Sequence, residues 1–277
     1  LQQTPKITCL KPSSGLLACD RIGEGRMANT DLIELAIRHI KAHIELKEGL
    51  KTDLHGLNFL VTAGPTQEAL DPARLLTNRS TGRMGVQIAQ AARLRGATVK
   101  LIHGPLDLPK GWLEGIDTYS IENSEEMRLL IRKFQSDSDV LIMAAAIADL
   151  RKKNGPSEEK SSKKNFLNSI HESLEEVPDL LKELVNQKNT NQVILGFAAL
   201  TGNSIEIQEN AKKKKFLKGC DLLMANPIDQ VDQGFGENPN GGFLIGPNQE
   251  VRTIPKTSKI ALSHKLLDAL IEIYRNI

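Results

Sequence analysis

Several features that mark special protein classes are scarce or absent in this sequence. It has three cysteines, Cys9, Cys19 and Cys220, and no CxxC pair, which favours a reducing compartment over a disulfide framework. Aromatic residues make up 4% of the 277 residues, which argues against a stacking platform for single-stranded nucleic acid. The net charge is only +2, and no run of about eighteen apolar residues forms a membrane span. We therefore expect a cytoplasmic protein that binds neither nucleic acid nor membranes.

The first fifty residues differ from the rest. A Gly- and Ser-rich loop around Cys19 precedes the helical pattern "NTDLIELAIRHIKAHIELKEG", which Asn29 or Thr30 would cap. The polar connector "LKTDLHG" follows, and we place a domain boundary there, between residues 1–53 and 54–277. The chain opens on "LQQTPKITCL", without Met or a signal-peptide pattern, so we expect a piece of a longer protein.

From Leu57 onward, short apolar runs alternate with helical patterns. The runs are typical of buried parallel strands, and they are "LNFLVTAG", "ATVKLIHG", "DVLIMAAAIAD", "NQVILGFAA" and "DLLMAN". Helices are predicted between them, one of them capped by Ser124, and a hairpin at "GGFLIGPNQEVRTIP" precedes a last helix. The alternation predicts an α/β fold, a doubly wound, mostly parallel Rossmann-like sheet with helices on both faces and a small C-terminal hairpin. The polar segment 151–165 is expected to be a mobile loop.

The stretch "NRSTGRMG" stands at the mouth of a predicted helix, with Ser80, Gly82 and Gly85 in or near its first turn. Free backbone N–H groups and the helix dipole favour an anion such as phosphate there. A helix start with glycines for close packing explains the same residues. The loop before the helix is too long for a dinucleotide fingerprint, and the second strand ends in His103 and Gly104 rather than in an acidic residue.

Two further patterns point to the same edge of the sheet. Lys214 and Lys218 are four residues apart on a helix, so their ammonium groups share a face and can clamp a polyphosphate. Small residues and Asp149 end the strand "MAAAIAD", leaving room for a flat ligand, with a carboxylate for a metal or a sugar hydroxyl. A solvated basic face and a packed strand end are the structural alternatives. Together the patterns suggest a nucleotide with several phosphates, accompanied by Mg²⁺.

Several ordered motifs resemble phosphopantothenate–cysteine ligase, also called phosphopantothenoylcysteine synthetase. They are "VTAGPTQEALDPARLLTNRSTGRMG", "AAAIAD", "GFAALT", "AKKKKFLKGCDLLMAN" and a late "SK", spread over about residues 54–277. The resemblance implies a two-step reaction in coenzyme A biosynthesis. CTP converts the carboxylate of 4′-phosphopantothenate to an acyl-cytidylate with release of pyrophosphate, and the amine of cysteine then displaces CMP. The residues leave the choice between CTP and ATP open.

The same resemblance implies roles for individual residues. Asn78 matches an active-site Asn of the second step. Other positions match the nucleotide site, namely Ala144, Ala145, Asp149, Lys160, Phe197, Lys214 and Lys218. The substrates are assigned to Ser80, Gly82, Gly85 and Asn226. The loop motif here is Lys-Ser-Ser-Lys-Lys, one residue longer than is usual in the family, so either Lys160 or Lys163 can take the nucleotide contact.

The N-terminal part resembles a different enzyme half. "PSSGLLACDRIGEGRM" is similar to the substrate clamp of the FMN-dependent phosphopantothenoylcysteine decarboxylase, with Cys19 at its catalytic position. That family's flavin-binding core lies upstream and is absent here, so FMN and decarboxylation belong to a full-length bifunctional protein. The resemblance also implies a homodimer through the ligase domain.

Two other functions compete with the ligase. The first is a nucleotide-binding domain without catalysis, against which the joint presence of Asn78, Lys214 and Lys218 speaks. The second is an NAD(P)-dependent reductase on a similar fold. A reductase predicts a Tyr-x-x-x-Lys pair, and neither Tyr119 nor Tyr274 has a Lys four residues on.

Overall fold

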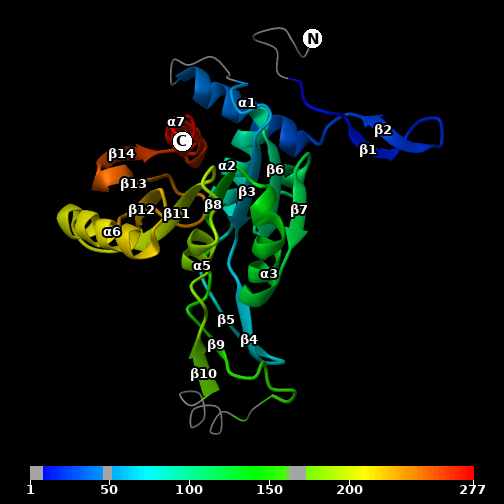
Figure 1. The fold of residues 1–277 in the computed structure, drawn as a ribbon. Coiled ribbons are helices and arrows are strands. Elements are labelled where there is room, and N and C mark those ends of the chain that lie inside the picture. The colour runs from blue at the N-terminus through cyan, green and yellow to red at the C-terminus, as the bar shows by residue number, and fades with distance from the viewer. Residues whose placement is uncertain (1–8, 46–51, 161, 163–172) are drawn as a thin grey trace.

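The computed structural model describes residues 9–45, 52–160, 162 and 173–277. Its centre is an eight-stranded sheet in the order β14-β13-β12-β11-β8-β3-β6-β7 (Figure 1). The strands are β3 (Asn58–Ala63), β6 (Thr98–His103), β7 (Asp117–Ser120), β8 (Val140–Met143), β11 (Val193–Leu200), β12 (Leu222–Pro227), β13 (Asn240–Ile245) and β14 (Val251–Thr257). All neighbours from β7 to β12 run parallel, and β13 and β14 add an antiparallel edge.

The parallel strands follow the doubly wound order, in which the chain fills one half of the sheet before the other. It starts in the middle at β3, moves outward to β6 and β7, and then crosses to β8 on the other side of β3. The switch point between β3 and β8 is where such sheets bind ligands, at the carboxyl ends of the strands. The predicted fold class is confirmed, and so is the C-terminal hairpin, which is formed by β13 and β14.

Helices cover both faces of the sheet (Figure 1). The two buried clusters of apolar residues place α2 (Arg83–Leu94) and α7 (Lys259–Tyr274) on one face, and α3 (Ser124–Phe134), α5 (Leu180–Asn186) and α6 (Ser204–Lys218) on the other. Helix α1 (Thr30–Glu45) lies outside the first layer, against α7 and the short 3₁₀ helix η1 (Lys110–Leu113). Two more 3₁₀ turns are η2 (Gln135–Asp137) and η3 (Pro247–Gln249).

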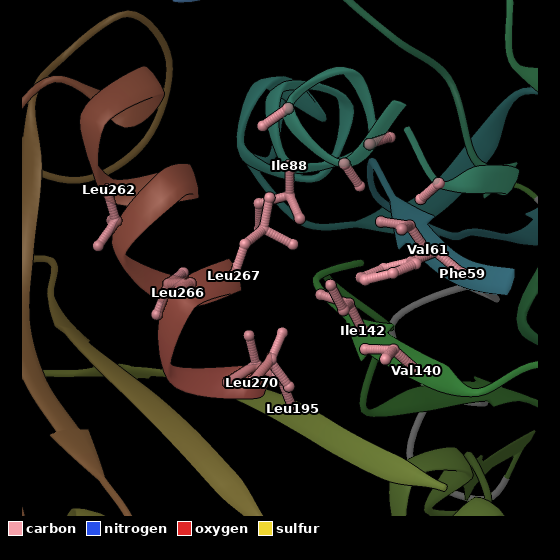
Figure 2. Packing of buried hydrophobic residues seen from close by; sticks show 14 of the residues in the cluster. Phe59, Val61, Ile88, Val140, Ile142, Leu195, Leu262, Leu266, Leu267 and Leu270 are labelled. Atoms are coloured by element: carbon pink, nitrogen blue, oxygen red, sulfur yellow. The ribbon is translucent and has the colours of Figure 1, made fainter. Parts of the chain in front are cut away.

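The sheet core follows from the continuous apolar runs of its strands. Phe59 and Val61 of β3 belong to the cluster under α2 and α7, whereas Leu60, between them, belongs to the opposite cluster, because successive side chains of a strand point to opposite faces. Figure 2 shows Leu267 of α7 and Ile88 of α2 on the sides of their helices that face Phe59 and Val61. Each such buried side chain contributes about 1.5–3 kcal/mol by leaving water.

Within the described ranges, three two-stranded ribbons lie outside the main sheet, and the sequence patterns did not predict them. They are β1 (Ser13–Leu16) with β2 (Ile22–Arg26), β4 (Gln67–Asp71) with β5 (Arg74–Thr77), and β9 (Leu150–Lys152) with β10 (Leu174–Glu176). The ribbon β4–β5 fills the predicted long loop before α2. The start of the predicted mobile loop is instead strand β9, where Arg151 Nε lies 2.8 Å from Glu175 Oε1. Residues 161 and 163–165 of that loop lie outside the described part of the chain.

The N-cap residue predicted from the sequence is confirmed for α1 and is wrong for α3. Asn29 precedes α1, and its side chain accepts a hydrogen bond from the Asp31 N–H at 2.9 Å. The predicted cap Ser124 is wrong by one residue, since Asn123 caps α3 by accepting from the Glu126 N–H at 2.9 Å. The Ser124 N–H instead donates to the buried carboxylate of Glu68 at 2.8 Å, which ties α3 to the ribbon β4–β5.

A buried arginine fixes the connector between α1 and β3. Arg95, just after α2, is fully buried and ion-pairs with Asp53 of the connector at 2.8 Å and with Asp268 of α7 at 2.7 Å. The bidentate pair with Asp53 orients both side chains.

None of the helices in the described ranges has the length and the apolar composition of a membrane-spanning segment.

Candidate active site

A cavity of about 710 Å³ opens at the carboxyl ends of β8, β11 and β12. Its wall combines the start of α2, the segment 144–149 after β8, the start of α5, the last turns of α6 and the segment after β12. This is the ligand-binding edge of a doubly wound sheet, and the volume suits a drug-sized or nucleotide-sized ligand. Most of the predicted site residues line it, namely Asn78, Ser80, Gly82, Ala144, Ala145, Asp149, Phe197, Lys214, Lys218 and Asn226.

Asn78 joins the ribbon β4–β5 to the segment after β8. Its amide nitrogen donates to the Ala146 carbonyl at 3.2 Å and to the Ile147 carbonyl at 3.0 Å. Both donors of the amide are thereby used, and the carbonyl oxygen Oδ1 is the atom that can accept from a ligand. In this state Asn78 shapes the cavity wall and offers an acceptor rather than a donor to the ligand.

The mouth of α2 is built for a close approach of backbone. Gly82 has φ 77°, and a Cβ there would lie 2.1 Å from Leu106 Cδ2 and 3.2 Å from the Gly64 nitrogen. The Gly82 N–H donates to Ser80 Oγ at 3.3 Å. No side chain of the described residues caps α2, so N–H groups of its first turn are available to an anion.

Gly85 does not line the cavity, in contrast to its predicted role with substrate. It is buried against β3, where a Cβ would lie 2.6 Å from Ala63 Cβ and 2.7 Å from the Thr62 carbonyl oxygen. The absence of a side chain lets α2 pack closely on β3. The packing explanation that the sequence left open therefore accounts for Gly85, while Gly82 stands at the cavity.

The basic wall of the cavity carries Lys214 and Lys218, as the four-residue spacing predicted. Lys218 forms an ion pair with Asp179. The other oxygen of Asp179 caps α5 by accepting from the Lys182 N–H at 3.1 Å. Lys213 of the same helix is exposed and stays outside the lining, so the helix presents only part of its lysine run to the cavity.

No group of three or more His, Cys, Asp or Glu side chains that could hold a metal occurs within the described ranges. Mg²⁺ typically keeps several waters and binds through one or two carboxylates together with substrate phosphates. Asp149 lines the cavity and can supply such a carboxylate. A carboxylate at this position fits a magnesium ion that arrives with a nucleotide.

Two cations at the cavity were missed by the sequence patterns. Arg83, the first residue of α2, reaches Glu237 Oε1 with its Nη2 at 2.6 Å and lies over the Trp112 ring at 4.9 Å. Lys259, the first residue of α7, is only 6% exposed. Burial, with a smaller effect from the nearby Arg83 charge, lowers the pKa of Lys259 from its ordinary 10.5 to about 8. The signal for Lys259 was the late "SK" motif, which had received no role.

Besides Gly85, two predicted residues lie away from the cavity lining. Cys19 is exposed in the turn that joins β1 and β2, on the ribbon that projects from the body (Figure 1). Lys160 is exposed and is not part of the lining. Its alternative, Lys163, lies outside the described residues. The remaining predicted residues line the cavity, and Asn226 is buried with its amide donating to the Gly241 carbonyl at 3.0 Å.

A family model described as the C-terminal domain of the DNA/pantothenate metabolism flavoprotein matches residues 54–274. The chain belongs to this family. It is 35% identical over 264 residues to the coenzyme A biosynthesis bifunctional protein CoaBC of Bacillus subtilis, covering 94% of this chain and 61% of the relative. The CoaBC protein of Escherichia coli K12 is 32% identical over 265 residues, with 95% and 62% covered. The chain thus spans about three fifths of the length of these relatives.

Structural similarity agrees with this family. The crystal structure of the C-terminal domain of a CoaBC protein superposes with a TM-score of 0.65 at 29% identity, covering 81% of this chain and 98% of that one. The family match begins at residue 54, and it includes the whole eight-stranded sheet and every cavity-lining residue.

Proposed function

We propose that this chain is a phosphopantothenate–cysteine ligase of coenzyme A biosynthesis. The observation that carries the proposal is the cavity at the carboxyl ends of β8, β11 and β12, where Asn78, Asp149, Lys214 and Lys218 converge in a chain of the pantothenate flavoprotein family. The CoaBC relatives act in coenzyme A biosynthesis by name. The substrates are 4′-phosphopantothenate, cysteine and a nucleoside triphosphate, which we assign as CTP.

In the first step, a carboxylate oxygen of 4′-phosphopantothenate attacks the α-phosphorus of CTP. The new P–O bond replaces the bond to the β-phosphate, and pyrophosphate leaves with its negative charge. Lys214 and Lys218 stand at the basic wall and stabilise that charge electrostatically. Asp149 would hold a Mg²⁺ ion, which would supply further neutralisation of the phosphate oxygens.

In the second step, the amine of cysteine attacks the acyl carbon of the mixed anhydride. A C–N bond forms, the C–O bond to CMP breaks, and the amine proton passes to solvent. Asn78 offers Oδ1 as an acceptor for an amine N–H while its Nδ2 holds the 146–147 backbone. The rate enhancement of this step comes mainly from the orientation of the two reactants, which lowers the entropic barrier of a bimolecular step. Backbone N–H groups at the α2 start, next to Ser80 and Gly82, take an anionic group of the substrate.

The N-terminal residues and the assembly belong to the same proposal. We assign residues 1–53 to the end of a decarboxylase half, with Cys19 as its catalytic cysteine and FMN held by the remainder of a full-length protein. The exposed β1–β2 ribbon is consistent with a segment that acts on another part of the assembly. We assign a homodimer to the ligase domain.

The test is a ligase assay on the protein with 4′-phosphopantothenate and Mg²⁺, with CTP or ATP, and with or without cysteine. We expect pyrophosphate with CTP, and the cysteine amide only when cysteine is present. Turnover with ATP but not with CTP would support the ligase function and overturn the assignment of CTP as the nucleotide. A folded protein that releases no pyrophosphate with either nucleotide would refute the proposed function.

A further inference from the structure

One wall of the cavity is a loop that joins β12 to β13, residues 228–239. Gly234, Phe235 and Gly236 of this loop line the cavity. The base of the loop is tied to the sheet, because the Ile228 N–H donates to the Leu200 carbonyl at 3.0 Å and Asp229 accepts from the Gly202 N–H at 2.8 Å. The tip, which contacts the cavity, is held differently.

Two side chains from the starts of two helices hold the tip. Lys259 Nζ donates to the Gly234 carbonyl at 2.7 Å and also to the Asn238 carbonyl. Arg83 Nη2 pairs with Glu237 Oε1 at 2.6 Å. The segment 234–238 is therefore bound at both of its ends by one ammonium group and between them by one guanidinium.

The position of Lys259 is unfavourable for a lysine. It is the first residue of α7, where the helix dipole presents its positive end. It is buried, and Arg83 adds a like charge close by. A methionine of similar shape would avoid the desolvation of an ammonium group. Stability alone therefore does not explain a lysine here, whereas a donor with several N–H groups for the loop carbonyls does.

We propose that Lys259 is a positioning residue of the ligase. With Arg83 as the second anchor, it clamps the 234–238 segment so that Phe235 and Gly236 form a fixed wall for the substrates. This inference rests on the proposed function for its catalytic meaning. The clamp itself is a property of the loop and is measurable without any substrate.

The experiment compares wild type, Lys259→Met, Lys259→Arg and the control Lys256→Met, an exposed lysine of β14 outside the cavity lining. Amide hydrogen exchange is followed by mass spectrometry, and steady-state constants are measured for each ligase substrate. For Lys259→Met we expect exchange in 229–239 to rise at least about fivefold, with other segments unchanged. We also expect KM for one substrate to rise about tenfold, the size of a lost charge-assisted hydrogen bond, with kcat within about twofold. Lys259→Arg is expected to show smaller increases in both the exchange of 229–239 and the KM, and Lys256→Met is expected to match wild type.

The two readouts separate the possible failures. Unchanged exchange in Lys259→Met would overturn the clamp, even if KM rises, since Lys259 would then act on the substrate directly. Raised exchange with unchanged KM would overturn the positioning role. If wild type shows no ligase activity, the proposed function fails, and the exchange result still decides whether Lys259 holds the loop.

Discussion

Lys218, in the last turn of α6, forms an ion pair with Asp179, the residue that caps α5, at the wall of the cavity. Both side chains are about one third exposed. The carboxylate holds the ammonium group between two helices and keeps it at the cavity before any ligand arrives. In the proposed ligase, an incoming polyphosphate would therefore meet a cation that is already oriented, although it would share that cation with Asp179.

Replacement of Lys218 by Met should weaken nucleotide binding. A charge-assisted hydrogen bond contributes about 1.5–3 kcal/mol, so KM for the nucleotide should rise by about 10- to 100-fold at similar stability. Lys213→Met, an exposed lysine on the same helix outside the cavity lining, is the matched control. Equal effects of the two substitutions in the pyrophosphate assay would show that only the general basic charge of α6 matters.

Gly85→Ala should lower stability and leave substrate binding unchanged. The new methyl group would meet Ala63 Cβ at 2.6 Å and the Thr62 carbonyl oxygen at 2.7 Å, and overpacking of this kind costs about 1–3 kcal/mol. Thermal unfolding should shift down by several degrees. Gly23→Ala is the control, since its Cβ meets only Leu17 Cδ1 at 3.4 Å. An increase in a substrate KM without a change in Tm would contradict the packing role and show that Gly85 takes part in substrate binding.

The main sheet was predictable because its parallel strands are buried on both faces. Such strands are continuous apolar runs, as in "LNFLVTAG" and "DVLIM". The two-stranded ribbons were not predicted, for the opposite reason. β4, β5, β9 and β10 are three to five residues long and partly exposed, so their patterns resemble those of loops. Only pairing across the chain, for example of Leu150–Lys152 with Leu174–Glu176, defines them.

Arg95→Met should be strongly destabilising. Removal of this fully buried guanidinium leaves the partly exposed carboxylates of Asp53 and Asp268 without their shared cation. The loss of one partner of a fully buried ion pair costs about 3–5 kcal/mol, and solvent screening of these two carboxylates places the expected loss near the lower end of that range. Arg252→Met removes an exposed arginine that pairs with Glu250 and Glu272, and surface pairs contribute about 1 kcal/mol at most. Urea unfolding of both variants compares them directly. Similar losses would contradict a structural role of Arg95 in fixing the connector.

Because of Lys259, the free energy of unfolding should depend on pH in the alkaline range. Its pKa is lowered from 10.5 in the unfolded chain to about 8, so the unfolded state binds its proton more tightly. The resulting penalty is fully present below pH 8 and is relieved as the pH rises from about 8 toward 10.5. Relative to Lys259→Met, the unfolding free energy of wild type should therefore increase over this window. A difference that stays constant from pH 7 to 10 in urea titrations would contradict the lowered pKa.

The candidate site was predictable where chemistry and spacing coincided. Lys214 and Lys218 share a helical face by their four-residue separation, and the small residues after β8 mark a strand end open to a ligand. Arg83 and Lys259 were not predicted, because single cations at helix starts look like solvated side chains in a sequence. Their contacts with the loop 228–239 depend on how that loop meets the starts of α2 and α7, which only the fold determines.

The most direct test of the two-step ligase is a single-turnover experiment without cysteine. The protein, in excess over 4′-phosphopantothenate, is mixed with CTP and Mg²⁺, and the quenched mixture is analysed by mass spectrometry. We expect the acyl-cytidylate and pyrophosphate in equal amounts, and conversion of the former to 4′-phosphopantothenoylcysteine and CMP when cysteine is added. Formation of CDP and phosphate, or of no adduct in the folded protein, would contradict the account.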